Sequence, residues 1–170
     1  DFFNKNSETR YSYKNTDIIV WDNQLVYVVS FKPLPYINDA LYQGKLYINL
    51  NNYALAGADF SFKPEKMKRL GGMFIVRKSK KIKVKPVENR YTVSYSPING
   101  TYFPNHIRGQ LIINVKKRQH FFSQNYQMFF EMAYTQIDTL NITKPKFSKS
   151  IKTNSIFADL LYNYSTDNFW

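Results

Sequence analysis

The sequence predicts a mainly β protein: a curved antiparallel meander that forms an open or half barrel, with one or two short helices. Apolar and polar residues alternate through seven or more successive stretches, which is the period of strands with one covered face. Tyr and Phe are abundant, with 14 of each against only 6 Gly, and aromatic side chains favour pleated sheets. A long meander curls through its intrinsic twist, so we expect an open barrel.

The segment 43–62, QGKLYINLNNYALAGADFSF, predicts a β-hairpin at the centre of this sheet. Leu46, Ile48 and Leu50 alternate with polar or aromatic residues and predict one apolar face. Asn51-Asn52 predicts the tight turn, because Asn tolerates left-handed backbone. The return strand is expected to place five residues on one face: Ala54, Ala56, Ala58, Phe60 and Phe62.

Two strands are predicted before this hairpin. Residues 11–21 alternate loosely, Asp22-Asn23 predicts a turn, and residues 25–31 then alternate again. Residues 32–42 contain two prolines, which cannot donate to a ladder of backbone hydrogen bonds, so we expect a loop there.

After the hairpin, Pro64 suits the first turn of a short helix that Gly71-Gly72 would stop. Alternation then predicts further strands, a turn at Asn99-Gly100 and a polar connection at residues 119–125. These strands are expected over residues 73–77, 77–85, 90–96, 107–115 and 126–134. Residues 143–153 are expected to form a loop, and residues 155–164 have helical spacing.

Parts of the chain resemble the central domain of the carboxypeptidase-like regulatory-domain envelope proteins of Bacteroidetes-type bacteria. The resemblance rests on an F-x-P strand end, a G-K-L-Y-I strand, a Y-A-L return strand and a closing D-N-F-W. It implies a cell-envelope location, periplasmic or associated with the outer membrane, and a non-catalytic role. The residues concerned are Phe31, Pro33, Asp39, 44–48, 53–55, Asp59, Phe60 and 167–170.

The length of 170 residues fits a single β-rich domain over residues 1–170. The chain starts and stops in mid-pattern, so we expect a fragment of a longer protein. There is no Cys, which leaves neither a disulfide framework nor thiolate chemistry. The sequence contains no run of 18 apolar residues, so it predicts no membrane-spanning helix.

Catalytic patterns are missing from the sequence, so we expect no enzyme activity and no cofactor. His106 and His120 lack nearby residues at metal-ligand spacing and are expected in exposed loops. No G-x-S-x-G elbow occurs, and the acids are scattered, although Asp39 and Asp59 can approach across the hairpin. The alternative, suggested only by the resemblance, is an accessory or degenerate domain of a carboxypeptidase-like hydrolase.

Positive charge is concentrated between residues 63 and 90, where 11 cations face 2 acids. Such a patch attracts polyanions, and anionic lipid, an acidic protein surface or nucleic acid would fit it. No module signature supports specific nucleic-acid binding. The other interpretation is a solvated edge strand that Lys protects from aggregation. The candidates for anionic-surface binding, on one face of the predicted strand 77–85, are Arg77, Lys81, Lys83 and Lys85.

The inward face of the curved sheet is predicted to be a packed core or a cavity for an apolar ligand such as an acyl chain. The function predicted from these observations is a non-catalytic envelope domain that binds apolar or anionic envelope components or a partner protein. Its oligomeric state is open. The candidate core or cavity residues are Leu46, Ile48, Leu50, Phe60, Phe62, Leu111, Ile113, Phe130 and Met132.

Overall fold

The computed structural model describes residues 7–138 and residue 155. The chain divides into two compact units, Asp1–Thr135 and Gln136–Trp170, and the fold described below is that of the first. A single domain over residues 1–170 stays a prediction. The loop expected at residues 143–153 and the helical spacing of residues 155–164 lie outside the described residues, apart from Ser155.

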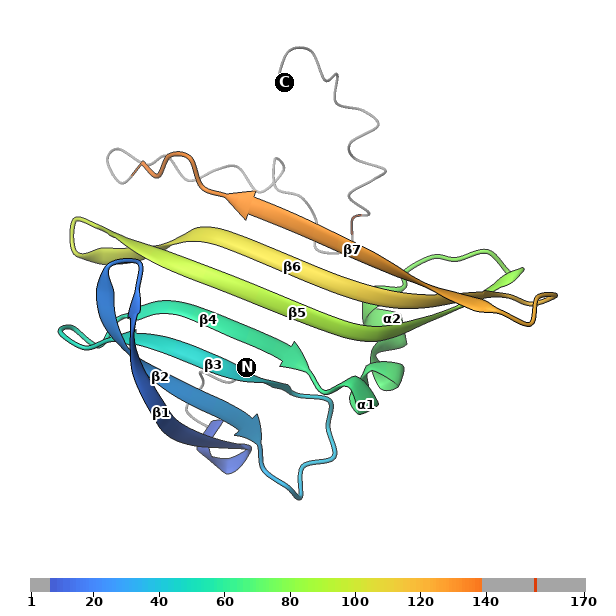
Figure 1. Ribbon diagram of the computed structural model, residues 1–170, viewed down its shortest axis with the longest axis horizontal. Coiled ribbons are helices and arrows are strands. Elements are labelled where there is room, and N and C mark those ends of the chain that lie inside the picture. The colour runs from blue at the N-terminus through green and yellow to red at the C-terminus, as the bar shows by residue number, and fades with distance from the viewer. Residues whose placement is uncertain (1–6, 139–154, 156–170) are drawn as a thin grey trace, which may run out of the picture. The chain divides into compact units, whose positions relative to one another are not determined.

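Seven strands form one antiparallel sheet in which each strand pairs with the next in the chain (Figure 1). The predicted meander is therefore confirmed. The sheet is open and half-barrel-like, because the first and last described strands have no pairing with each other. The strands are β1 (Tyr11–Trp21), β2 (Gln24–Pro33), β3 (Tyr42–Asn49), β4 (Leu55–Phe62), β5 (Ile82–Ile98), β6 (Thr101–Lys117) and β7 (Ser123–Ala133).

Two of the predicted turns are confirmed by their backbone angles. Asp22 and Asn23, with φ of 48° and 60°, join β1 to β2, and Asn99 and Gly100, with φ of 50° and 81°, join β5 to β6. Left-handed residues at both central positions give the turn a twist that matches the flanking strands. These dipeptides thus fix two hairpins of the meander.

The turn between β3 and β4 contains Asn51-Asn52 as predicted, but its backbone differs from the prediction. It spans residues 50–54, and its left-handed residue is Tyr53, with φ of 57°, rather than Asn51 or Asn52. The Asn49 side chain accepts hydrogen bonds from the backbone N–H groups of Asn51, at 2.8 Å, and Asn52, at 3.3 Å. Asn49 thus stabilises the turn through its side chain, which accepts hydrogen bonds from the turn backbone. Leu50 consequently lies in the turn and not on the strand face.

A β-bulge in the central hairpin corrects the predicted register. Tyr47 pairs with Gly57 but Ile48 pairs with Leu55, so Ala56 is the extra residue. Because a bulge reverses the alternation, Ala56 and Ala58 point to opposite faces of the sheet. The prediction that they share one face was wrong.

Both faces of the first four strands are therefore buried. One cluster, which we call the Phe31 face, contains Tyr11, Phe31, Leu46 and Ala58. The other, the Tyr47 face, contains Val26, Val28, Tyr47 and Ala56, with Ile19 and Trp21 packed against them. Trp21 stacks on Tyr47 with ring centroids 4.1 Å apart.

Three short helical turns connect β4 to β5: α1 (Pro64–Met67), η2 (Lys68–Leu70) and α2 (Gly71–Phe74). Pro64 occupies the first turn as predicted, and Met67 is fully buried. The Gly pair does not stop the helix, because Gly71 has φ of −50° and opens α2. The strand predicted over 73–77 was wrong, since α2 covers its start and the remainder is irregular. A further turn, η1 (Ser7–Thr9), precedes β1.

The last three strands are far more exposed than the first four, and two of them are longer. β5 and β6 have 17 residues each, and every residue of β7 is exposed. Within β5 and β6 only Pro86, Asn89 and Gly109 are buried. The side-chain oxygen of Asn89 accepts a hydrogen bond from the Phe62 backbone N–H at 3.0 Å. This bond links β4 to β5 beyond Phe60, where their regular backbone pairing ends.

Candidate functional site

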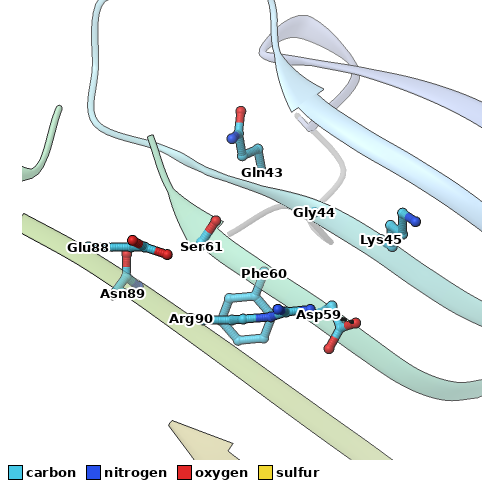
Figure 2. Close-up of a pocket in the computed structure, with 9 residues that line it drawn as sticks. All are labelled: Gln43, Gly44, Lys45, Asp59, Phe60, Ser61, Glu88, Asn89 and Arg90. Carbon is cyan, nitrogen blue, oxygen red and sulfur yellow. Dashed lines mark ion pairs between the residues drawn. The ribbon is translucent and has the colours of Figure 1, made fainter. Parts of the chain in front are cut away.

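Two polar surfaces of the sheet are candidates for function. The first is an open groove of about 310 Å³ on β3, β4 and β5, which we call the Asp59 groove (Figure 2). In Figure 2, Asp59 from β4 and Arg90 from β5 point toward each other, and their charged atoms lie 3.9 Å apart. Its lining residues are Gln43, Gly44, Lys45, Asp59, Phe60, Ser61, Glu88, Asn89 and Arg90.

Hydrogen bonds hold the Asp59 carboxylate from two sides. The Tyr47 hydroxyl donates to one oxygen at 2.9 Å, and the Thr92 hydroxyl donates to the other at 2.6 Å. Each partner comes from a strand that pairs with β4, so the ladder itself sets this geometry. Both oxygens already accept a hydrogen bond from the fold, and the carboxylate acts as a structural anchor.

Burial, and after it the hydrogen bond to Asp59, raises the pKa of the Tyr47 phenol to about 12. Phenolate next to a carboxylate would place two negative charges side by side. The pair therefore stays in the form in which Tyr47 donates and Asp59 accepts.

Asp39 and Asp59, the two acids that the sequence predicts could approach each other, are held by other residues. Asp39 forms an ion pair with Arg10, while Asp59 is held by Tyr47 and Thr92, so the two predicted neighbours have different partners. Over residues 7–138 and residue 155, no three His, Cys, Asp or Glu side chains gather where they could hold a metal ion.

The two histidines have different positions. His120 lies in the exposed β6–β7 loop, as expected. His106 was expected in a loop but lies on β6, half-buried, with Nε2 2.6 Å from the Glu131 carboxylate on β7. The sequence separation of 25 residues hid this pair, which only the strand register brings together.

The second candidate surface is basic and lies where β5 begins and β6 ends. Pairing places Lys83 directly opposite Lys116, and Ile82 opposite Lys117. The Arg118 backbone N–H donates to the Lys81 carbonyl at 3.0 Å, which extends the pairing past the strand ends. We call this surface the basic end and define it as Lys80, Lys81, Lys83, Lys116, Lys117 and Arg118.

Of the four cations proposed from the sequence, two belong to the basic end. Lys81 directly precedes β5, and Lys83 lies on it. Lys85 lies two pairs further along, opposite Asn114 and on the same face as Lys83. Arg77 lies in the irregular segment after α2, so the strand predicted over 77–85 exists only from Ile82 onward.

Sequence reasoning missed the β6 half of the basic end. The motif Lys116-Lys117-Arg118 is visible in the sequence, but its proximity to Lys83 depends on register. The sequence does contain a signal for this proximity. If residues are paired one by one outward from the Asn99-Gly100 turn, Lys83 pairs with Lys116. One bulge on each strand, at Pro86/Glu88 and at Ser94/Tyr95, leaves that count unchanged.

Like charges face each other across the basic end. A cross-strand pair such as Lys83 and Lys116 is destabilising in isolation. No ion pair among the described residues neutralises any of the six cations. Beside them is a hollow of about 670 Å³, lined by Ser79, Lys80, Lys81, Ile82, Lys117, Arg118, Gln119 and His120. This arrangement favours an anionic partner.

The nine candidate core residues divide between the two halves of the sheet. Leu46 and Phe62 are buried, and Ile48 and Phe60 are half-buried and pack against the Phe31 face. Leu111 and Ile113 on β6 are half-buried. Phe130 and Met132 on β7 are 54% and 46% exposed, which removes them from the core.

Exposed apolar residues instead form a row along β7, which the register places on the face shared with Leu111. Phe130 lies above Gly109 on β6, where any Cβ would overlap its ring. The row consists of Tyr126, Met128, Phe130 and Met132.

No helix within the described residues has the length and hydropathy needed to cross a membrane. Comparison with known proteins found no protein family, no curated protein and no solved structure similar to this chain. The resemblance to the carboxypeptidase-like regulatory-domain proteins therefore stays a prediction.

Proposed function

We propose that this chain is a non-catalytic domain of the cell envelope that binds an anionic surface through its basic end. The single observation that carries the proposal is the register of β5 and β6, which places Lys83 opposite Lys116 with no acid between them. The cations at this end repel one another, and anionic groups that lie against them would offset this repulsion. The envelope location is supported by the sequence resemblance.

Charge removal at the basic end tests this proposal. Lys81, Lys117 and Arg118 are exposed, so changing all three to Ser should leave the folded sheet intact. Each cation near an anionic lipid surface contributes about 1 kcal/mol, and the triple variant should bind anionic vesicles about 100-fold more weakly. Cosedimentation with phosphatidylglycerol vesicles at low salt measures this difference.

A matched control removes the same charge elsewhere. Lys14, Lys32 and Lys45 are three exposed cations on β1, β2 and β3 that line another hollow, of about 350 Å³. Their replacement by Ser should leave vesicle binding within about threefold of wild type, allowing for the long-range effect of net charge. Equal losses in the two triple variants would show that net charge, and not the basic end, determines binding.

A further inference from the structure

The loop between β6 and β7 carries the most exposed aromatic residues in the described part of the chain. Phe121 and Phe122 are 93% and 87% exposed, and neither ring contacts another described aromatic ring. Figure 1 shows this connection at the end of the sheet where β5 begins, which is the location of the basic end. Two adjacent Phe side chains in water are unfavourable unless a partner covers them.

Hydrogen bonds fix the base of this loop and leave its apex exposed. The Arg118 N–H donates to the Lys81 carbonyl at 3.0 Å, and the His120 N–H donates to the Lys117 carbonyl at 3.1 Å. The Phe pair follows His120 directly, so in the chain it stands next to Lys117 and Arg118 of the basic end. From residue 89 to residue 130 the chain has no Asp or Glu.

We propose that Phe121 and Phe122 insert into the interface of an anionic lipid bilayer while the basic end binds lipid phosphates. This inference rests on the proposed function and adds the identity of the anionic surface. Exposed apolar side chains beside a cluster of cations offer the two kinds of group that an anionic bilayer binds, at its acyl chains and at its phosphates. Single-stranded nucleic acid would instead require rings laid flat along a backbone-binding groove.

Depth-dependent fluorescence tests the insertion. Phe121→Trp should show a blue shift on phosphatidylglycerol vesicles and quenching by lipids brominated on the acyl chain, after subtraction of the wild-type signal from Trp21 and Trp170. The matched control is Tyr36→Trp, whose parent side chain is 70% exposed in the β2–β3 loop, and it should show neither change.

Replacement of both rings tests their contribution to binding. Phe121→Ser with Phe122→Ser should weaken partitioning into anionic vesicles by about tenfold for each ring, because that is the effect of withdrawing one large apolar side chain from the interface. Its salt dependence should remain that of wild type, since the cations are retained. Circular dichroism checks that this variant is folded.

The outcomes separate the two proposals. Absence of wild-type binding to anionic vesicles at low salt overturns the anionic-surface function and the insertion with it. Normal binding with an unquenched Trp at position 121 and no loss in the double Ser variant overturns the insertion alone. Stacking on nucleic acid replaces insertion if a single-stranded oligonucleotide quenches that Trp and displaces the protein from vesicles.

Discussion

The first four strands and the last three share the same alternating sequence pattern, but buried residues are concentrated in the first four and rare in the last three. Within the described residues, every buried apolar side chain of the sheet except Pro86 belongs to β1, β2, β3 or β4, on one face or the other. By contrast, β7 has no buried residue, and β6 buries only Gly109. The first half therefore holds most of the buried core of the described sheet, and our proposal assigns the binding surface to the second half.

Truncating one large ring in each half should give the largest difference. Phe31 on β2 is 2% exposed, so Phe31→Ala should lower the free energy of unfolding by about 3 to 5 kcal/mol. Phe129 on β7 is 72% exposed, and Phe129→Ala should change it by less than about 0.5 kcal/mol. Urea denaturation measures both, and similar losses in the two variants would refute the division of the sheet.

Adding a methyl group to a glycine in each half gives a smaller but equally sharp contrast. A Cβ at Gly44 would overlap the backbone oxygen of Asp59 and lie 2.8 Å from the Cα of Phe60, so the backbone must shift. Gly44→Ala should cost about 1 to 3 kcal/mol or more.

At Gly109 the three atoms nearest to the added methyl group all belong to the ring of Phe130, a side chain that is 54% exposed and can change its rotamer more easily than backbone can shift. Gly109→Ala should therefore cost less than about 1 kcal/mol. Thermal melts of the two Ala variants decide the point, and a larger loss at Gly109 than at Gly44 would contradict it.

Alkaline pH should lower the free energy of unfolding, because two tyrosines in the first four strands ionise less readily in the folded protein than in the unfolded chain. The pKa of Tyr47 is raised to about 12 by burial and by Asp59, and that of Tyr42 to about 12 by burial and by Tyr91, from 10.0 in both cases. The unfolded chain then loses protons at lower pH than the folded one, so their stabilisation is complete below pH 10.0 and falls as the pH rises to about 12.

Tyr47→Phe removes one of these groups and should make the loss of stability between these pH values less steep. Stability against urea across the alkaline range measures the slope. An unchanged slope in this variant would show that Tyr47 ionises equally readily in the folded and unfolded chains.

Much of the fold follows from local patterns. Period-two alternation places strand β1 at its observed bounds, and the left-handed dipeptides Asp22-Asn23 and Asn99-Gly100 fix two of the hairpins. Both signals act within a few residues, so sequence alone reveals them.

What failed depends on pairing partners far away in the chain. Strand β5 begins at Ile82 and not at Arg77 because β6 ends at Lys117, and a strand extends only as far as its partner does. The bulge at Ala56 has no local cause in the alternation, yet it exchanges the two faces of the central hairpin. For the same reason only half of the basic end was found.

Hydrogen exchange of the wild-type protein with and without phosphatidylglycerol vesicles tests the central claim most directly, because it measures both halves of the sheet in one sample. Our account predicts added protection at residues 80–83 and 116–122, where the basic end and the Phe pair lie, and unchanged exchange in β1, β2, β3 and β4. Added protection centred on the first four strands, or no added protection at residues 80–83 and 116–122, would contradict it.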